Sequence, residues 1–439
     1  MHFSTDQQTL NDLAIFGKPG AASVYELFNR AQTTGGANRI ADLFRYPLAD
    51  PEAINNRVQA IRDLGRRFSE FPFRRELFEA IETYLQQTDE RTRMVRQGSG
   101  LADRLKNAVA TDPHHKLLLA GIAATAELLA ALPGFLAAID ADAAGTTLQT
   151  ELAPVRAVAA DRSLLLGDDV ARDQLFRFKR REDIRIVLQA IYLVDAYLSV
   201  ARVAHERGFC YPEALPAESG TVKLEGVYHP HVKNAVANTL YIHPQGNIVF
   251  LTGANMAGKS TLMKSLGIAL YLAHMGFPVP ARSLSFAVRE GIYTSINLPD
   301  NLGKGISHFY AEVLRVKKVA RELGAGKQLF IIMDELFRGT NVKDAYEATV
   351  ALTSAFAARV NCMFVVSTHI MEAGEALRKE VNNIQYVFLP TKMDGNKPVY
   401  TYTLEQGITA DRHGMVIVRN AGILELLAKT EGGVACALS

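Results

Sequence analysis

The spacing of hydrophobic and polar residues changes near the middle of the chain. Before residue 215, leucine, alanine and arginine recur at helical spacing and β-branched runs are rare, which predicts a mostly helical region. Apolar residues over 183–204 recur every three or four positions, which predicts one long helix with a core-facing stripe. Asp50 before Pro51 predicts another helix start, because aspartate caps helices and proline is favoured at the first helical position.

After residue 220, short apolar runs alternate with helical stretches, as is typical of an α/β domain with a largely parallel sheet. Between the two regions, residues 211–220 are rich in proline, glutamate and glycine and predict a linker. We therefore expect a helical domain over 1–215 and an α/β domain over 216–439. The predicted strands are 240–243, 247–251, 291–296, 329–333, 363–366 and 386–389.

One apolar segment, residues 117–139, is long enough to cross a bilayer. Because Glu127 and a Pro133-Gly134 pair interrupt it, two buried helices joined by a turn at 132–134 are favoured over a membrane span. The N-terminus has no signal-peptide pattern, and the three cysteines fit no metal or redox spacing. These features favour a cytoplasmic protein without a membrane partner.

The 439 residues are 48% hydrophobic and 21% charged, which is enough for two or three domains with apolar cores. The formal net charge of +2 does not by itself indicate a nucleic-acid-binding protein.

A candidate phosphate-binding loop lies in the C-terminal half. A β-branched, apolar run leads into Gly253-x4-Gly258-Lys259-Ser260, and an apolar stretch over 261–273 predicts a helix after it. In such a loop backbone N–H groups face phosphate oxygens, Lys259 reaches the β- and γ-phosphates, and the Ser260 hydroxyl ligates Mg²⁺. The alternative is a glycine-rich turn between a strand and a helix. The candidate nucleotide-binding residues are Gly253, Ala254, Asn255, Met256, Ala257, Gly258, Lys259, Ser260 and Thr261.

Two further predicted strands end in polar residues. The run 329–333 is followed by Asp334 and Glu335. After a phosphate loop, Asp334 would hold Mg²⁺ and Glu335 would accept the proton of the attacking water; the alternative is a buried strand capped by exposed acids. The run 363–366 continues into Ser-Thr-His, where His369 would sense or polarise the γ-phosphate or act as a structural hydrogen bonder.

Five motifs occur in an order that resembles the MutS family of mismatch-repair ATPases. They are the Asn255-Met256 pair within the loop and the segments 305–312, 334–341, 367–369 and 402–414.

This resemblance implies an ABC-type P-loop ATPase domain preceded by an all-α core or lever domain. It implies ATP hydrolysis with Mg²⁺, with Glu335 as the catalytic base and His369 assisting. Ser307 lies in the segment that resembles the family's signature, which reaches the partner's nucleotide in a dimer and therefore implies a homodimer. The N-terminal half resembles the family's helical core more weakly, at 9–13, 33–40 and 46–58.

The resemblance also has departures. The motifs begin at the core domain, so we expect a DNA-binding ATPase for double-stranded or branched DNA, in mismatch repair or related DNA maintenance, without a mismatch-reading or connector domain. The alternative is an ATP-switched protein-interaction module that does not bind DNA specifically; a transporter ATPase is disfavoured because its usual signature is missing. The basic segment 172–185 could contact phosphates, although a solvated helix face is favoured. Ala235 stands where the family usually has an aromatic residue against adenine, and Tyr228 or His231 could substitute.

Overall fold

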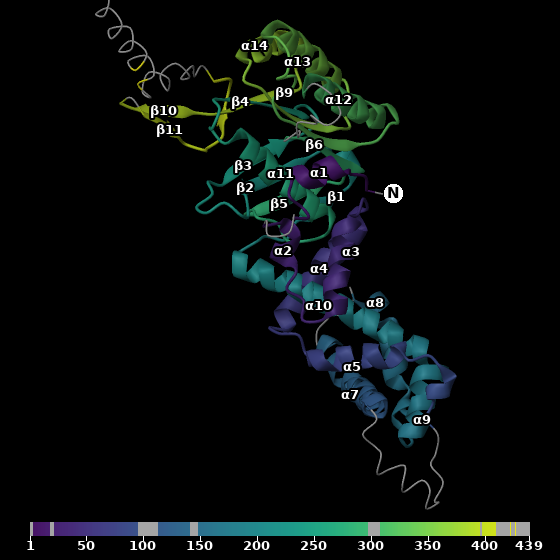
Figure 1. Ribbon diagram of the computed structural model, residues 1–439. Helices are drawn as coiled ribbons and strands as arrows, with labels where there is room; N and C mark the ends of the chain where they lie inside the picture. Colours follow the sequence, from purple (N-terminus) through teal and green to yellow (C-terminus); the bar gives the residue numbers. More distant parts are fainter. Residues whose placement is uncertain are drawn as a thin grey trace, which may run out of the picture. The chain divides into compact units, whose positions relative to one another are not determined.

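The chain folds into two compact units, which we call the sheet unit and the helical unit (Figure 1). The sheet unit comprises residues 1–24, 47–55 and 208–439, and the helical unit comprises 25–46 and 56–207. The boundary at residue 215 between family domains stays a prediction. The computed structural model describes residues 3–17, 22–94, 113–140, 148–296, 308–395 and 397–409, together with Gly422 and Leu426.

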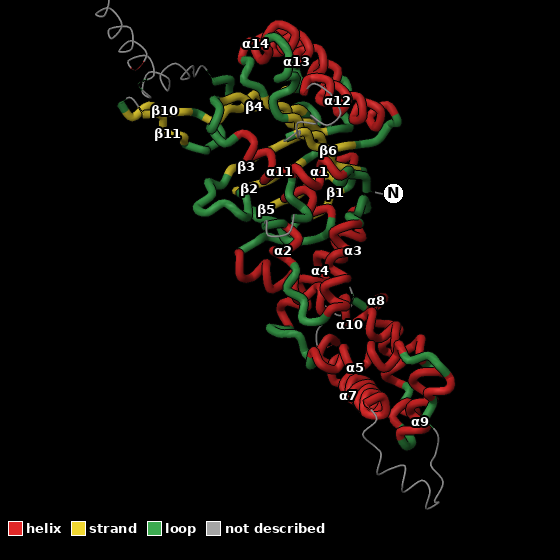
Figure 2. Tube along the Cα trace, viewed as in Figure 1, coloured by secondary structure: helices red, strands yellow, loops and turns green. Residues whose placement is uncertain are grey.

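Within its described residues, the helical unit contains helices and loops but no strand (Figure 2). Its central helix is α10, where almost every side chain from Ala190 to Ala204 is buried. The helices between residues 24 and 207 are α2 (Val24–Phe28), α3 (Thr34–Arg45), α4 (Pro51–Arg67), α5 (Arg75–Gln86), η1 (Glu90–Thr92), α7 (Pro113–Asp140), α8 (Gln149–Ala160), η3 (Arg162–Leu165), α9 (Asp169–Asp173), η4 (Gln174–Lys179) and α10 (Arg181–Arg207).

The start of α3 shows how a short polar motif fixes helix packing. Thr33 caps the helix by accepting a hydrogen bond from the Gly36 N–H at 2.9 Å. The buried carboxylate of Asp195, on α10, accepts hydrogen bonds from the Thr33 hydroxyl at 2.7 Å and its N–H at 2.8 Å. A Cβ on Gly36 would lie 2.2 Å from the Asp195 carboxylate, so this close approach requires glycine.

The long helix predicted over 183–204 is confirmed as part of α10, whereas the turn predicted at 132–134 is wrong. α7 is one helix with Pro133 inside it. Pro133 is exposed, while Leu132, Phe135 and Leu136 are buried. The helix therefore buries its apolar face, and the position where proline has no N–H to donate lies on the exposed side. By length and composition α7 and α10 could cross a membrane, which core helices of soluble proteins also could; 50% of the apolar window of α7 and 83% of that of α10 are buried.

The sheet unit confirms the predicted α/β organisation. Its main sheet has the order β12-β9-β4-β8-β7-β6, in which neighbouring strands are parallel except for the antiparallel pair β12–β9. Five of the six predicted runs lie in this sheet. The strands are β4 (Ile248–Gly253), β6 (Gly291–Ser295), β7 (Leu329–Met333), β8 (Met363–Ser367), β9 (Ile384–Leu389) and β12 (Glu405–Gln406).

The second sheet contains the sixth predicted run. It also contains part of the segment predicted to be a linker, so the linker prediction is wrong. Residues 211–220 include β1, which pairs in parallel with β5, and a 3₁₀ turn η5, so this segment is part of the fold. A separate ribbon pairs β10 (Thr391–Asp394) with β11 (Lys397–Tyr400). The order of the second sheet is β1-β5-β2-β3, with bounds β1 (Glu213–Leu215), η5 (Ala217–Ser219), β2 (Val222–Val227), β3 (Asn238–Ile242) and β5 (Ser283–Ala287).

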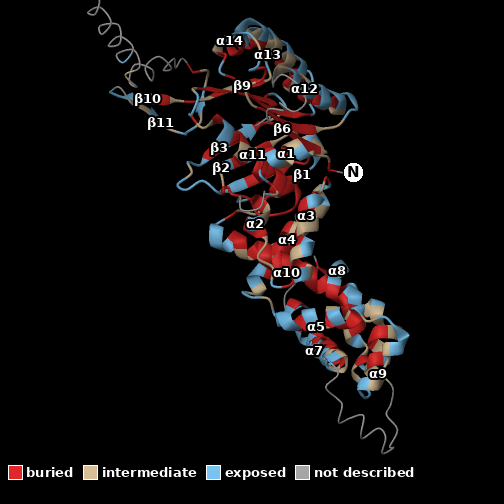
Figure 3. Cartoon of the chain, viewed as in Figure 1, coloured by how far each residue is buried: buried red, intermediate tan, exposed pale blue. Residues whose placement is uncertain are grey.

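Helices cover both faces of the main sheet. α11 (Lys259–His274) is almost wholly buried and contacts strands of both sheets. On the opposite face, α12 (His308–Gly324), α13 (Val342–Ala357) and α14 (Met371–Glu380) pack on an apolar core centred on β4, β7 and β8 (Figure 3). The N-terminal helix α1 (Gln7–Asp12) also belongs to this unit.

Candidate functional site

The candidate site lies at the carboxyl edge of the main sheet. β4 pairs in parallel with β8, and β8 pairs in parallel with β7. The loop after β4, the Asp334-Glu335 pair after β7 and the Thr368-His369 pair after β8 therefore follow strand ends at one edge. In open α/β sheets ligands bind outside the carboxyl ends of the strands.

The backbone of the predicted phosphate loop requires glycine at two positions. Gly253 has φ 148° and Gly258 has φ 99°, which other residues rarely adopt. A Cβ on Gly258 would also lie 3.0 Å from the Tyr402 ring. Met256 adopts φ 72° and is 76% exposed. α11 begins at Lys259, directly after the loop, two residues earlier than predicted.

Lys259 is buried beneath this loop, with 4% of its surface exposed. Its Nζ donates hydrogen bonds to the carbonyl oxygens of Gly253 at 2.9 Å and Ala254 at 3.2 Å. The same nitrogen lies 3.5 Å from Glu335 Oε1. The only side-chain cation of the loop is therefore placed beside the predicted base.

Asp334 is linked to both neighbouring segments. Its Oδ2 accepts a hydrogen bond from the Ser260 hydroxyl at 2.6 Å, and its Oδ1 accepts one from the Ser367 hydroxyl at 2.5 Å. Burial raises the pKa of Asp334 above its ordinary value and outweighs the opposing effect of the two hydroxyls; the nearby Glu335 carboxylate also raises it. Ser260 and Asp334 thus place a hydroxyl and a carboxylate oxygen side by side.

Glu335 is held in an uncommon backbone conformation, with φ 45°. Its carboxylate lies between two cations, 3.5 Å from Lys259 Nζ and 3.2 Å from an Arg338 guanidinium nitrogen. Its N–H donates to the Ser367 carbonyl at 3.0 Å. Left-handed conformations of residues other than glycine cost free energy and cluster at functional sites.

A pocket of about 800 Å³ opens over these groups. Of the predicted residues, it is lined by Asn255, Met256, Gly258, Lys259, Ser260, Thr261, Asp334 and Glu335.

The other predicted residues that the structure describes do not line the pocket. Gly253, Ala254 and Ala257 do not line the pocket, and Gly253 and Ala257 are buried. His369 is exposed at the end of β8 and does not line it either. Ser307 lies outside the described residues.

The lining of the pocket also includes Ala235, but neither Tyr228 nor His231. Its aromatic side chains are instead His229 and Tyr402. Burial lowers the pKa of His229 to about 4, with smaller contributions from the charges of nearby basic residues, so its imidazole is neutral at pH 7.

Tyr402 is fixed through Asn238, which also lines the pocket. The Asn238 side-chain amide donates to the Tyr402 carbonyl at 2.9 Å and accepts from the Leu404 N–H at 2.7 Å. Tyr402 is 45% exposed.

Ser367, Arg338 and Tyr402 lie within the motif segments 334–341, 367–369 and 402–414, but the sequence alone assigned none of them a role of its own. Ser367 had one available signal, because it is a polar residue at the end of a buried strand that precedes a polar pair. Arg338 and Tyr402 reach the site through backbone turns at Phe337 (φ 64°) and at Tyr402 itself (φ 55°). Such turns carry no simple residue pattern.

These observations define an α/β protein with a phosphate-loop pattern, a buried lysine and two carboxylates at one edge of a parallel sheet. Residues 249–434 match a family model described as MutS domain V. This match, which covers a little under half of the chain, makes this part of the chain similar to domain V of the MutS family.

Two relatives are both named DNA mismatch repair protein MutS. The protein from Persephonella marina (strain DSM 14350 / EX-H1) is 29% identical over 245 residues, which cover 55% of this chain and 28% of the relative. The protein from Anaeromyxobacter sp. (strain Fw109-5) is 28% identical over 263 residues, covering 56% of this chain and 29% of the relative. The similarity therefore extends over less than a third of each relative's length.

Proposed function

We propose that this chain is a MutS-family, Mg²⁺-dependent ATPase of the ABC type that binds ATP in the 800 Å³ pocket. The observation that supports this most strongly is the convergence of four side chains from two segments. Lys259 and Ser260 follow β4, whereas Asp334 and Glu335 follow β7, and contacts of 3.5 Å or less connect Lys259 with Glu335 and Ser260 with Asp334. A glycine-rich turn with only a structural role would not require these four side chains to lie together.

The loop and Lys259 would bind the phosphates. The N-terminus of α11 directs backbone N–H groups and the positive end of its dipole toward an anion. A phosphate would offer Lys259 Nζ charged oxygen partners in place of the two carbonyl groups that it now contacts. Charge-assisted hydrogen bonds of this kind are stronger than those between a lysine and a neutral carbonyl.

The residues near Asp334 fit Mg²⁺. This ion takes oxygen ligands and is usually held by one or two carboxylates together with substrate phosphates. The Ser260 hydroxyl and the Asp334 carboxylate are two such oxygens, 2.6 Å apart. When bound, Mg²⁺ would neutralise charge on the phosphate oxygens.

Glu335 would act as the general base. Its carboxylate borders the pocket beside Lys259, so a water molecule next to the terminal phosphate would be within reach of Glu335. Arg338 would orient the carboxylate through its 3.2 Å contact. We further propose that His369, next to this edge of the sheet, assists at the γ-phosphate.

We assign the base of the nucleotide to the part of the pocket that is lined by Ala235, His229 and Tyr402. Because Ala235 has no ring, His229 and Tyr402 would supply the aromatic contacts with adenine. We also propose a cytoplasmic homodimer in which Ser307 completes the partner's site, acting on double-stranded or branched DNA.

The nucleotide proposal is tested by the variant Lys259→Met, which keeps the length of the buried stem and removes the charge. We expect the Kd for a fluorescent ATP analogue to rise at least about tenfold, the equivalent of about 1.4 kcal/mol, with hydrolysis lost. Lys317→Met, on an exposed position of α12, is the charge-matched control and should bind as the wild type does. Unchanged affinity in Lys259→Met would contradict the proposed site.

The dimer and the DNA substrate need separate measurements. The molecular mass in solution should double when ATP is added, and a mass that stays monomeric would refute the shared site. Binding to branched, mismatched and linear duplexes is compared at several salt concentrations. If no DNA binds more tightly than the non-specific level of about 10⁻⁴–10⁻⁶ M, with or without ATP, the protein-interaction alternative is favoured.

A further inference from the structure

The N-terminal segment Phe3 to Leu13, which we call the N-terminal clamp, lies along the edge of the main sheet. The Ser4 N–H donates to the Glu290 carbonyl at 2.7 Å, and the Ile292 N–H donates to the Ser4 carbonyl at 3.1 Å. β6 is the outermost strand on that side, so the clamp covers part of an open sheet edge. Residues almost 290 positions apart are thereby brought together.

The clamp also packs against α11, the helix that begins with Lys259 and Ser260. The Phe3 ring lies 4.8 Å from the His274 ring and 6.1 Å from the Tyr271 ring, between centroids. Leu13 sits against Gly267, where a Cβ would lie 2.5 Å from Leu13 Cδ2. The N-terminal clamp therefore packs against α11, the helix that follows the candidate phosphate loop.

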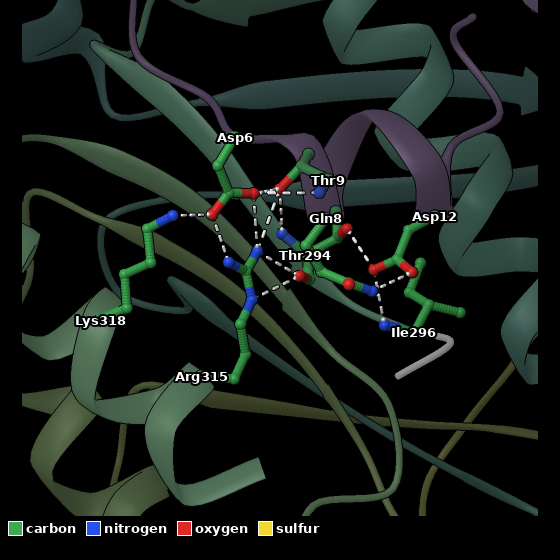
Figure 4. A network of polar contacts seen from close by, with 8 residues as sticks. All are labelled: Asp6, Gln8, Thr9, Asp12, Thr294, Ile296, Arg315 and Lys318. Carbon is green, nitrogen blue, oxygen red and sulfur yellow. Dashed lines mark hydrogen bonds and ion pairs between the residues drawn. The ribbon is translucent and has the colours of Figure 1, made fainter. Parts of the chain in front are cut away.

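Asp12 connects the clamp with the wall of the pocket (Figure 4). It is 3% exposed, and its Oδ2 accepts hydrogen bonds from the Thr294 hydroxyl at 2.7 Å and the Ile296 N–H at 2.9 Å. Gln8 donates to its other oxygen at 2.8 Å. Ile296, which directly follows β6, lines the pocket. A single buried carboxylate thus fixes the backbone of a pocket-lining residue.

Asp6 fixes the other side of the same network. It caps α1 by accepting from the Thr9 N–H at 3.0 Å, and it pairs with Arg315 and Lys318 on α12. Burial alone would raise the pKa of Asp6. Hydrogen bonds from Arg315 and Lys318 outweigh this effect and hold the pKa of Asp6 well below its ordinary value. Arg315 also donates to the Thr294 carbonyl at 3.0 Å, so α1, β6 and α12 share one polar network (Figure 4).

We propose that Asp12 is a positioning residue for nucleotide binding, which holds Ile296 in the pocket wall from within the N-terminal clamp. This inference rests on the proposed ATP site. Without the carboxylate, the Thr294 hydroxyl and the Ile296 N–H both lose an acceptor, and the Ile296 backbone loses this tether at the pocket. The loss of defined geometry at a binding wall lowers affinity even where the fold survives.

The test compares Asp12→Ala with Asp12→Asn in the full chain, by titration with a fluorescent ATP analogue and Mg²⁺ well below the unfolding temperature. Asp12→Ala should raise the Kd about tenfold. Asp12→Asn keeps an oxygen for both donors, and a flip of the Gln8 amide would satisfy its NH₂ group, so its Kd should stay within about threefold of the wild type. Thr294→Val removes one of the two bonds and should raise the Kd about threefold, which keeps the test available if Asp12→Ala does not fold.

The matched control is Asp63→Ala in the helical unit. Asp63 is also a buried carboxylate, 6% exposed, that accepts from the Gln59 side chain at 2.7 Å, but Gln59, unlike Ile296, does not line the pocket. The Asp63→Ala substitution should lower the thermal stability of the protein and leave the Kd for the ATP analogue unchanged. Wild-type affinity in both Asp12→Ala and Thr294→Val would overturn the positioning role and leave the ATP site standing. A wild-type chain that binds no ATP analogue would overturn both proposals.

Discussion

The stability of the sheet unit should depend on the protonation of one buried histidine, His274. Its ring is fully enclosed on α11, where Nδ1 donates to the Leu270 carbonyl at 2.7 Å. Its Nε2 accepts from the Arg289 N–H at 3.1 Å, so this nitrogen carries no proton in the folded protein. Burial lowers the pKa of His274 from 6.5 to about 4.

The direction of the pH dependence follows from the difference between the ordinary pKa of histidine, 6.5, and the pKa of about 4 in the folded protein. Between pH 6.5 and 4 the unfolded chain binds a proton that the folded chain does not, so the free energy of unfolding falls as the pH falls. The stabilisation is complete above pH 6.5 and is lost toward pH 4. The two pKa values give a loss of about 1.4 kcal/mol at pH 5.5 and about 3 kcal/mol by pH 4.

The assay is urea unfolding at pH 7.5 and 5.5, followed by circular dichroism, for the wild type and His274→Gln. The difference in unfolding free energy between the two proteins should change by about 1.4 kcal/mol between the two pH values. Titration of His229 occurs in both proteins and cancels in this comparison. His205→Gln, an exposed position on α10, should leave the pH dependence unaltered. A wild-type-to-variant difference that is the same at both pH values would refute the reasoning.

Two further predictions concern packing and buried charge, both measured by urea unfolding. Gly267→Ala should destabilise the protein by about 1–3 kcal/mol, because its Cβ would meet a leucine of the N-terminal clamp at 2.5 Å; Gly324→Ala, which has open space, should be neutral or stabilising by up to about 1 kcal/mol. Arg177→Met leaves Asp173 buried without its cation and should cost about 3–5 kcal/mol. The exposed ion pair of Arg74 supplies the control, and Arg74→Met should cost much less than Arg177→Met, because water screens exposed ion pairs. Equal effects of the two glycine variants would contradict the close packing at Gly267, and equal effects of the two arginine variants would contradict the buried ion pair of Arg177.

Much of the sheet unit could be predicted because its elements are encoded locally. Strands such as β7 and β8 are buried on both faces and therefore appear in the sequence as short continuous apolar runs. Gly253 and Gly258 stand where the backbone adopts positive φ, so the loop pattern and its geometry have the same cause. Parallel pairing then brings Asp334 and Glu335 to the loop without any further information.

The features that sequence reasoning missed depend on distant partners. Asp12 looks like an ordinary polar residue of a short helix, because its acceptor role depends on Thr294 and Ile296, more than 280 residues away. Residues 211–220 have a linker composition, yet β1 gains its hydrogen-bond partners from β5. Pro133 lies on an exposed side of α7, and only the packed structure determines that side.

The central claim is that Glu335 is the general base of an ATPase, and Glu335→Gln tests it most directly. A glutamine keeps the size and the hydrogen-bonding oxygen of the side chain but cannot accept the proton of the attacking water. Single-turnover hydrolysis of radiolabelled ATP is measured with excess enzyme and Mg²⁺, with Glu347→Gln, an exposed position on α13, as the control. We predict ATP binding within a few-fold of the wild type and hydrolysis at least about 100-fold slower, with the control unchanged. Hydrolysis by Glu335→Gln at the wild-type rate would contradict the account.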